Sequence, residues 1–336
     1  MIPKRRFGQD GVEVSAIGFG AWTLGLDWWG KVDDRTASAL VDRAIERGIT
    51  FFDTADTYGA GVGEERLAKA LAGRRDDVQV GTKFGYDITV PHEQRGHSER
   101  PQRWDPAFIR ERCEASLRRL GADVIDLYEL HNPRMAQIRD GAIFATLDAL
   151  RDEGKIRAYG VALGPAIGWE AEGLEALRTR DVEAVQTVYN LLEQDPGRSF
   201  LREAGGKAGV IARVPHASDA LTGRFTPDAV FPATDHRSFR KREWLLRALR
   251  NVERMDFLLD GRTIGQVAIS WCLAQPGITS VLPTMTTVEE VDEYTGAADV
   301  PLGDEEVARL RELYERDFDL PPAAPEERIE LRSSMG

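Results

Sequence analysis

The sequence predicts a single (β/α)8 TIM barrel preceded by an N-terminal β-hairpin. Short apolar segments alternate with stretches whose apolar residues recur at helical spacing, which indicates a parallel sheet with right-handed crossovers. Eight such units in about 300 residues match the size of this barrel. A doubly wound sheet is the alternative, but it needs a glycine-rich fingerprint after its first strand. Residues 18–23 lack the third small residue of that pattern.

The expected strands are short apolar runs. The hairpin is predicted over residues 5–17, because residues 9–11, Gln-Asp-Gly, are a turn signal between two apolar segments. Barrel strands are predicted at 17–23, at the start of 51–59, and at 78–83, 124–131, 156–161, 184–188, 210–214 and 278–282.

The expected helices follow the strands and carry capping residues. Asp33 or Asp34 can cap the first helix and Gly48 can end it, while Asp105 with a following proline caps another. Helices are predicted near 33–48, 64–71, 105–121, 143–152, 168–178, 240–257, 263–274, 287–294 and 304–316.

Composition and charge narrow the functional classes. The net charge of −12 repels a nucleic-acid backbone on average, but local basic groups and helix N-termini still allow an anionic cofactor. Cys113 and Cys272 fit no metal spacing and are expected to be buried apolar side chains. No run of 18 apolar residues and no apolar leader is found, so a cytoplasmic protein is expected. The barrel domain is predicted to span residues 1–318, followed by a proline- and charge-rich tail at 319–336.

The stretch 51–59, FFDTADTYG, changes from apolar to polar at Asp53. Polar groups at the C-terminal ends of barrel strands face the active site, so Asp53 and Tyr58 are expected to enter one pocket. The next two strands end in Lys83 and His131. Because neighbouring strand ends lie side by side in a barrel, the four side chains are predicted to converge.

These four residues suit protonation of a developing alkoxide while another group delivers hydride. The Lys83 ammonium is expected to lower the pKa of Tyr58, Asp53 to hold Lys83, and His131 to polarise a carbonyl oxygen. Taken singly, Lys83 also fits a salt-bridged surface lysine, and Tyr58 fits a core tyrosine with a solvated hydroxyl. Four suitable residues at matched strand ends favour the functional interpretation.

Two long motifs resemble those of the aldo-keto reductases, and the resemblance covers almost the whole chain. Residues 52–59 with the glutamates 64–65 are similar to that family's Asp–Tyr signature. Residues 116–128 with His131 are similar to its second signature.

The resemblance implies a function and roles for the four residues. Tyr58 would be the general acid, Lys83 and Asp53 would tune it, and His131 would orient the carbonyl. The family binds a nicotinamide cofactor in extended form over the barrel mouth. The implied activity is NAD(P)H-dependent reduction of a small-molecule aldehyde or ketone, sugar-like compounds included.

The nicotinamide side of the implied cofactor site departs from the family's pattern. After the fifth strand the family usually has Gly-Val-Ser-Asn, whose Ser and Asn hold the carboxamide, whereas residues 160–163 here are Gly-Val-Ala-Leu. Gln186, the third carboxamide contact, is present. Arg213 replaces an aromatic residue that stacks on the nicotinamide; a guanidinium can stack on a ring, but its charge would disfavour the oxidised cofactor.

The adenosine side departs further. Residues 221–224 resemble the family's phosphate-side loop, but where NADPH-preferring members carry Lys, Ser, Arg and Asn this chain has Thr284, Met285, Glu290 and Tyr294. The basic clamp is missing and Glu290 would repel a 2′-phosphate, so NADH is expected to bind at least as well as NADPH. The predicted cofactor contacts are Thr23, Gln186, Arg213, Val214, His216, Gly223, Arg224, Thr284, Thr286 and Glu290.

Two interpretations of the barrel stay open. The first is a reductase with altered cofactor contacts. The second is a diverted family member, either a redox-neutral enzyme or a ligand-binding or regulatory protein, that uses Arg213, His216 and the four strand-end residues on another anionic ligand. A pure scaffold is disfavoured, because ionisable groups gathered at a barrel mouth are costly to place without use.

The substrate pocket is expected to be shaped by loops. Trp22, Trp28 and Trp29 follow the first strand and form either an apolar plug or a wall of the substrate site. The segment 86–104 is long for a connection and is expected to contribute. No nucleic-acid or membrane partner is expected, while the substrate's identity and the oligomeric state stay open.

Overall fold

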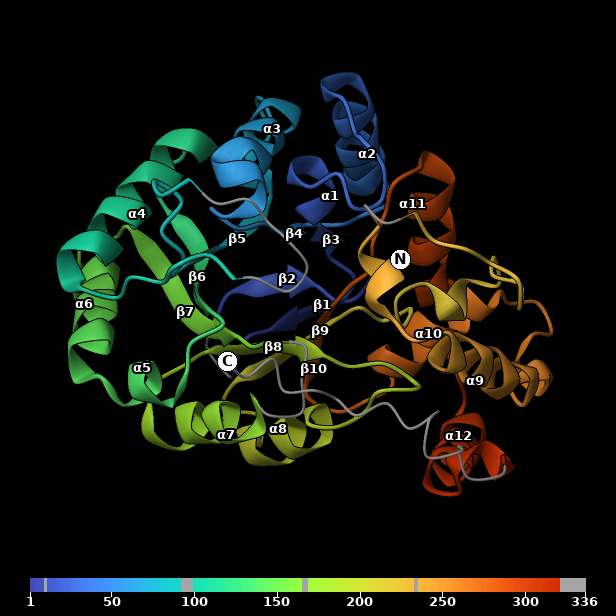
Figure 1. Ribbon diagram of the computed structural model, residues 1–336. Helices are drawn as coiled ribbons and strands as arrows, with labels where there is room; N and C mark the ends of the chain where they lie inside the picture. The colour runs from blue at the N-terminus through green and yellow to red at the C-terminus, as the bar shows by residue number, and fades with distance from the viewer. Residues whose placement is uncertain (9–10, 92–98, 165–168, 233–234, 321–336) are drawn as a thin grey trace.

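Eight parallel strands surrounded by helices form the (β/α)8 barrel that the sequence predicts (Figure 1). The structure is a computed structural model that describes residues 1–8, 11–91, 99–164, 169–232 and 235–320. The sheet order is β10-β9-β8-β7-β6-β5-β4-β3, and its neighbouring strands are all parallel. The strands are β3 (Phe19–Gly20), β4 (Phe51–Asp53), β5 (Gln79–Phe84), β6 (Ile125–His131), β7 (Ile156–Ala162), β8 (Ala184–Val188), β9 (Gly209–Arg213) and β10 (Ile278–Leu282).

The barrel closes between its first and last strands. Ile17, just before β3, forms a parallel bridge with Val281 of β10. The Gly18 N–H donates to the Val281 carbonyl oxygen at 2.9 Å, and the Val281 N–H donates to the Ala16 carbonyl oxygen at 2.9 Å. These bonds leave the sheet without a long exposed edge.

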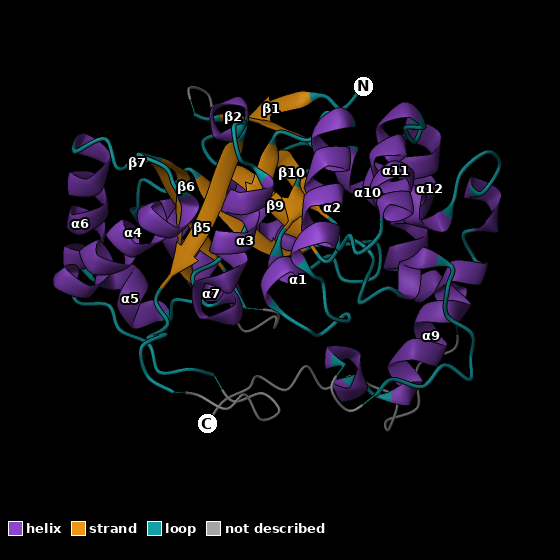
Figure 2. Ribbon diagram, turned by 90° about the horizontal axis from the view of Figure 1, so that it is seen from above, coloured by secondary structure: helices purple, strands orange, loops and turns teal. Residues whose placement is uncertain are grey.

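The N-terminal hairpin covers the end of the barrel where the strands begin (Figure 2). Its strands β1 (Lys4–Arg6) and β2 (Glu13–Ser15) pair antiparallel, and residues 9 and 10 of the predicted turn at 9–11 lie outside the described residues. Phe7 is 1% exposed and meets Phe51 of β4 edge to face, with ring centroids 5.7 Å apart. The hairpin thus seals one end of the barrel and leaves the carboxyl ends of the strands for a site.

Capping residues fix several helix ends, as the sequence predicts. The Asp33 and Asp105 side chains accept from backbone N–H groups of the helices that they precede, and Gly121 ends one helix with φ 60°. The helices are α1 (Trp22–Gly25), α2 (Asp34–Glu46), α3 (Val62–Ala70), α4 (Pro106–Leu120), α5 (Met135–Arg139), α6 (Gly141–Asp152), α7 (Glu170–Thr179), α8 (Gly197–Ala204), α9 (Arg242–Glu253), α10 (Ile264–Leu273), α11 (Val288–Thr295) and α12 (Asp304–Glu315).

The first barrel strand is shorter than the predicted 17–23. Only two residues form β3, and the chain then turns into the short helix α1. The turn folds the Trp22 indole back over Gly20, where an added Cβ would lie 2.3 Å from the ring. A side chain at position 20 would collide with the indole, so this turn requires a glycine there.

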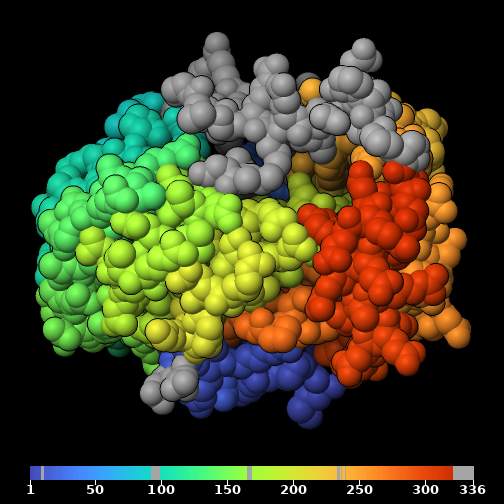
Figure 3. Space-filling model, turned by 90° about the horizontal axis from the view of Figure 1, so that it is seen from below, coloured from blue at the N-terminus to red at the C-terminus, as the bar shows by residue number. Residues whose placement is uncertain are grey.

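The first residues of the chain and α12 lie on different parts of the surface. Figure 3 shows the N-terminal residues at one end of the molecule and α12 on its flank. The predicted tail lies outside the described residues from residue 321 onward. Cys113 and Cys272 are free and buried, as expected. None of the helices in the described part of the chain combines the length and apolar character that a transmembrane span requires.

Candidate active site

A buried ion pair between Asp53 and Lys83 lies at the carboxyl end of the strands. Asp53 ends β4, and Lys83 of the adjacent β5 donates from Nζ to Asp53 Oδ2 at 2.6 Å and to the Thr54 carbonyl oxygen at 2.7 Å. The two side chains are at most 1% exposed. Burial alone would lower the pKa of Lys83, but nearby negative charges, Asp53 foremost, outweigh burial and raise it. Lys83 is therefore a fixed positive charge.

Tyr58 lies beside this ion pair. Lys83 Nζ is 5.4 Å from the centroid of the Tyr58 ring, and the ring meets His131 edge to face with centroids 6.1 Å apart. Burial raises the pKa of Tyr58, and the positive charges of Lys83 and Arg213 offset burial only in part. The Lys83 charge does act to lower the pKa of Tyr58, as expected, but the net shift is upward because desolvation of the phenolate is the larger effect. The hydroxyl is consequently protonated near neutral pH and can donate.

His131 ends β6 and presents a neutral imidazole. Burial, with the positive charges of Lys83 and Arg213, lowers the pKa of His131 well below its ordinary value. Its Nδ1 is buried and has no hydrogen-bond partner among the described residues. A neutral ring beside Tyr58 can orient a carbonyl oxygen without competing for the proton.

Tyr86 supports His131 and was missed by sequence reasoning. Its ring meets His131 edge to face at 5.1 Å, and its hydroxyl accepts from Asn132 Nδ2 at 2.8 Å. Gln102 Nε2 donates to the His131 carbonyl oxygen at 3.1 Å. The predicted 86–104 segment therefore reaches the site at both ends, while its residues 92–98 lie outside the described residues. The position of Tyr86 three residues after Lys83, just past the end of β5, could have indicated from the sequence that it lies near the site.

Glu129 is a second buried carboxyl group that sequence reasoning missed. It is completely buried in β6, where it lies opposite Lys83 of β5 in the strand register. Gln186 Nε2 of β8 donates to Glu129 Oε2 at 3.2 Å and to Asp53 Oδ1 at 3.0 Å. Alternate residues of a strand point to the same face, so the spacing of Glu129 from His131 could have indicated it. Gln186 thus joins the two carboxyl groups.

Arg213 ends β9 and faces the same group of side chains. Its Nη2 donates to the Leu163 carbonyl oxygen at 2.8 Å, and its charge interacts with Tyr58 and Asp53. Burial lowers the pKa of Arg213, but an arginine stays charged at any physiological pH. Ala162 and Leu163 are 3% and 1% exposed and apolar, so their side chains offer a cofactor no hydrogen bond.

Arg224 and Glu290 form a separate cluster at the start of α11. The Arg224 guanidinium pairs with Glu290 Oε1 and donates to the Tyr294 hydroxyl at 2.6 Å. Glu290 Oε2 accepts from the backbone N–H groups of Thr286, at 2.6 Å, and Thr287, at 3.3 Å. The carboxylate therefore occupies the position at this helix start where an anion would otherwise bind.

The remaining predicted cofactor contacts differ in their surroundings. Thr23 is buried in α1, and its hydroxyl donates to a backbone carbonyl after β10 at 3.4 Å. Gly223 is exposed with φ 73°, Val214 has φ 57°, and Thr284 is partly exposed just after β10. His216 is 3% exposed and packs against Tyr294, and burial lowers its pKa to about 4. His216 is thus neutral near pH 7, and any contact with an anion would be a hydrogen bond and not an ion pair.

The three tryptophans form one aromatic group beside Tyr58. The Trp22 and Trp29 centroids are 6.5 Å apart, and those of Trp28 and Trp29 are 6.0 Å apart. Trp29 and Tyr58 pack against an apolar cluster that contains Trp22 and Phe51. The position of the group is compatible with both an apolar plug under the loop and a wall of the substrate site next to the candidate proton donor.

Comparisons with known proteins point to one family along most of the chain. A model of the Aldo/keto reductase family matches residues 16–315. The chain is 33% identical over 280 residues to the aldo-keto reductase YhdN of Bacillus subtilis, covering 80% of each chain. It is 31% identical over 341 residues to the aldo-keto reductase str7 of Strobilurus tenacellus, covering 94% of this chain and 92% of the relative.

Solved structures agree in fold. The glycerol dehydrogenase AKR11B4 from Gluconobacter oxydans superposes with a TM-score of 0.80 at 28% identity, covering 97% of each chain. An aldo-keto reductase from Klebsiella pneumoniae in complex with NADPH has a TM-score of 0.67 at 27% identity, covering 94% of this chain and 96% of that one.

Proposed function

The chain belongs to the Aldo/keto reductase family, and we propose that it reduces an aldehyde or ketone to the alcohol with Tyr58 as proton donor. The observation that carries the proposal is the grouping of Tyr58, His131 and the Lys83–Asp53 pair at the carboxyl ends of adjacent strands. The proposed substrate is a small-molecule carbonyl compound. We also propose that the protein is cytoplasmic, as expected from the sequence.

Each residue has a defined part in the proposed reaction. The Tyr58 hydroxyl holds the proton that passes to the carbonyl oxygen, and the neutral His131 ring orients that oxygen. Lys83, held by Asp53, stabilises the phenolate that Tyr58 leaves behind. A nicotinamide cofactor, when bound, would supply the hydride. The tryptophan group lies beside Tyr58 and lines one side of this site.

The side chains of the site can hold a nicotinamide dinucleotide, although several of them differ from those that the family usually has. The hydride-donating end would lie against Gln186 and Arg213, both of which face the Tyr58 group. The adenosine end would lie near Arg224 and the start of α11, where Glu290 already engages the guanidinium and two backbone N–H groups. This arrangement fits a ribose hydroxyl better than a 2′-phosphate, so NADH is proposed to bind at least as tightly as NADPH.

Titration of both cofactors tests this preference. Isothermal titration is expected to give an NADH affinity equal to or higher than that for NADPH. Glu290→Gln should strengthen NADPH binding by about tenfold or more, because it removes a repulsive charge and frees Arg224, and a hydrogen bond to a charged group contributes about 1.5–3 kcal/mol. A glutamine can keep the capping interaction at this helix position.

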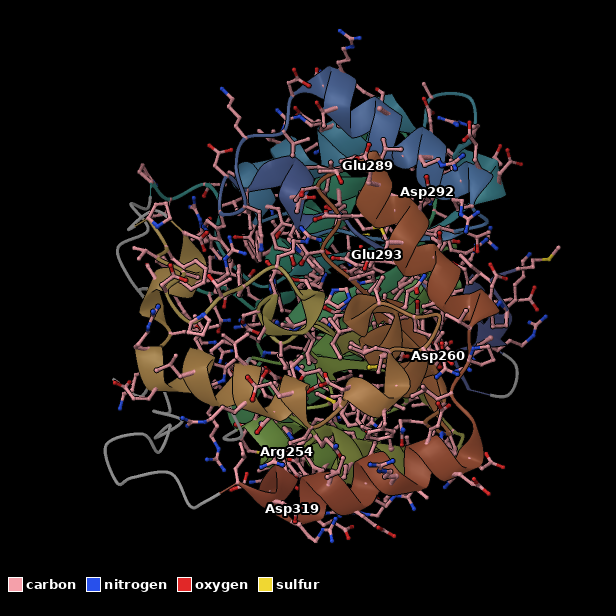
Figure 4. All side chains as sticks on the ribbon, turned by 90° about the vertical axis from the view of Figure 1, so that its right-hand side faces the viewer. Arg254, Asp260, Glu289, Asp292, Glu293 and Asp319 are labelled. Carbon is pink, nitrogen blue, oxygen red and sulfur yellow. The ribbon has the colours of Figure 1, made fainter. Side chains whose placement is uncertain are left out.

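The matched control for Glu290→Gln is a charge removal on the outer face of the same helix. Figure 4 shows Glu289, Asp292 and Glu293 along α11, and Glu289 is exposed whereas Glu290 is 7% exposed. Glu289→Gln should leave the cofactor preference nearly unchanged. A clear preference of the unmodified protein for NADPH would overturn the proposal for Glu290.

A diverted barrel is the second candidate function, and the apolar Ala162 and Leu163 favour it. They lie where the family's carboxamide ligands are expected, and Arg213 uses an N–H group on the Leu163 carbonyl oxygen. If neither NADH nor NADPH binds in the titration, the barrel acts as a redox-neutral enzyme or a ligand-binding protein.

A further inference from the structure

We propose that Glu129 is a positioning residue whose carboxyl group, when ionised, offsets the effect of the fixed Lys83 charge on Tyr58, and so sets the pH range over which Tyr58 donates its proton. Glu129 touches neither the reacting hydroxyl nor the expected position of a carbonyl, and it acts through its neighbours. The activity part of this inference rests on the proposed function, whereas its stability part does not.

The strand register places Glu129 inside the barrel. It is opposite Lys83 in β5 and Gly160 in β7, and it is 0% exposed. Leu127, two residues earlier on the same face of β6, belongs to the apolar cluster that fills the barrel interior. Glu129 is therefore a carboxyl group between an apolar layer and the Tyr58 group.

The hydrogen bonds of Glu129 are incomplete for a carboxylate. Its Oε2 accepts from Gln186 Nε2 at 3.2 Å, and the same nitrogen donates to Asp53 Oδ1 at 3.0 Å. Its Oε1 is buried and has no partner among the described residues. A buried carboxylate usually accepts several hydrogen bonds, so this environment favours a neutral carboxyl group.

The charges around Glu129 have mixed signs. Lys83 on β5 and Arg213 on β9 favour its ionised form, while Asp53 on β4 disfavours it, and burial is the largest influence. Tyr58 and the His131 ring on the same strand are uncharged near neutral pH. The balance raises the pKa of Glu129 to about 8. The group therefore changes its charge at a pH where enzymes are commonly assayed.

The charge state of Glu129 changes the acidity of Tyr58. While Glu129 is neutral, the positive charges of Lys83 and Arg213 stabilise the Tyr58 phenolate and make the hydroxyl a better acid. Once Glu129 is ionised, its negative charge offsets part of that effect. Proton donation should then slow as pH rises, since the efficiency of general acid catalysis depends on the pKa of the donor.

The pH dependence of kcat tests the activity part. With saturating cofactor and substrate, the unmodified protein should lose roughly threefold or more of its kcat between pH 7 and pH 9.5, with a midpoint near pH 8. Glu129→Gln carries no titratable group and should keep its kcat through this midpoint. An unchanged midpoint near pH 8 in Glu129→Gln would overturn the proposal.

Thermal unfolding without cofactor or substrate tests the titration itself. The pKa of Glu129 in the folded protein lies above its unfolded value of about 4.3, so the folded state binds the additional proton between these two values. The protonated Glu129 therefore stabilises the folded state, and this stabilisation decreases as pH rises from the unfolded to the folded pKa. The Tm of Glu129→Gln should therefore rise by several degrees relative to the unmodified protein between pH 5 and pH 8.

Glu172 provides the matched control. It is a buried glutamate of α7, in the outer ring of helices, and its Oε2 also lacks a hydrogen-bond partner among the described residues (Figure 1). Glu172→Gln should keep the kcat midpoint near pH 8. Should Glu129→Gln fail to fold, Glu129→Met removes the same titratable group at similar length and carries the same comparison.

The two measurements separate failure of the inference from failure of the proposed function. If no carbonyl reduction is found, the proposed function fails, and a constant Tm difference between pH 5 and pH 8 would overturn the inference independently. If the Tm difference changes with pH but the kcat midpoint persists in Glu129→Gln, Glu129 titrates without controlling Tyr58, and the inference is likewise overturned.

Discussion

Tyr58→Phe is expected to lower kcat for carbonyl reduction by about 10²–10⁴-fold, the range that general acid catalysis contributes. The substitution removes one hydroxyl and no ring atom, so the contacts with His131 and the apolar cluster remain. Cofactor affinity, measured by isothermal titration, and the thermal unfolding midpoint should change little. Steady-state kinetics with saturating cofactor measure the effect.

Tyr86→Phe is the matched control for that experiment. It removes a phenolic hydroxyl from a ring that also meets His131 edge to face, but this hydroxyl accepts from Asn132 and does not contact Lys83. Its kcat should stay within about tenfold of the original, a smaller loss than removal of a general acid causes. If Tyr58→Phe keeps near-normal turnover, Tyr58 is not the proton donor.

Lys83→Met is expected to reduce the free energy of unfolding by about 3–5 kcal/mol and to abolish activity. Methionine fills a similar volume but leaves the fully buried Asp53 carboxylate without its cation, since the Lys83 Nζ donates to Asp53 at 2.6 Å. An unpaired buried charge costs far more than an intact pair contributes. Chemical denaturation at constant pH measures the change.

The control for Lys83→Met removes an ammonium from a solvated ion pair. Lys155 pairs with Glu114 and with Glu153, and these side chains are 32–41% exposed. Lys155→Met should leave the unfolding free energy nearly unchanged, because surface ion pairs are screened by water. If both variants lose the same unfolding free energy, burial does not make the Lys83–Asp53 pair more important for stability than a surface ion pair.

Local sequence signals were sufficient for the architecture. The alternation of apolar strands with helical periodicity predicted the barrel, and caps such as Asp33 and Asp105 marked the starts of helices, because periodicity and capping depend on residues close in the chain. The positions of Asp53, Tyr58, Lys83 and His131 followed from a single topological rule, since the carboxyl ends of neighbouring parallel strands lie together.

Charge states and competing contacts depended on the tertiary structure. The sequence suggested that Lys83 lowers the pKa of Tyr58, but burial, which no local pattern reveals, reverses the net direction. Glu290 was expected to repel a phosphate, but only the folded chain brings it to Arg224, 66 residues away, and to the start of its own helix.

The hydrogen bonds that connect Asp53, Gln186 and Glu129 show most clearly what the sequence alone could not predict. Gln186 and Asp53 are separated by 133 residues, and no spacing in the chain indicates that one amide nitrogen serves two carboxyl groups. By itself, the sequence determined which chemical groups stand at the ends of the strands. Tertiary structure decided which of those groups form ion pairs or hydrogen bonds and which are desolvated, because distances across the barrel and burial are fixed only when all eight strands close.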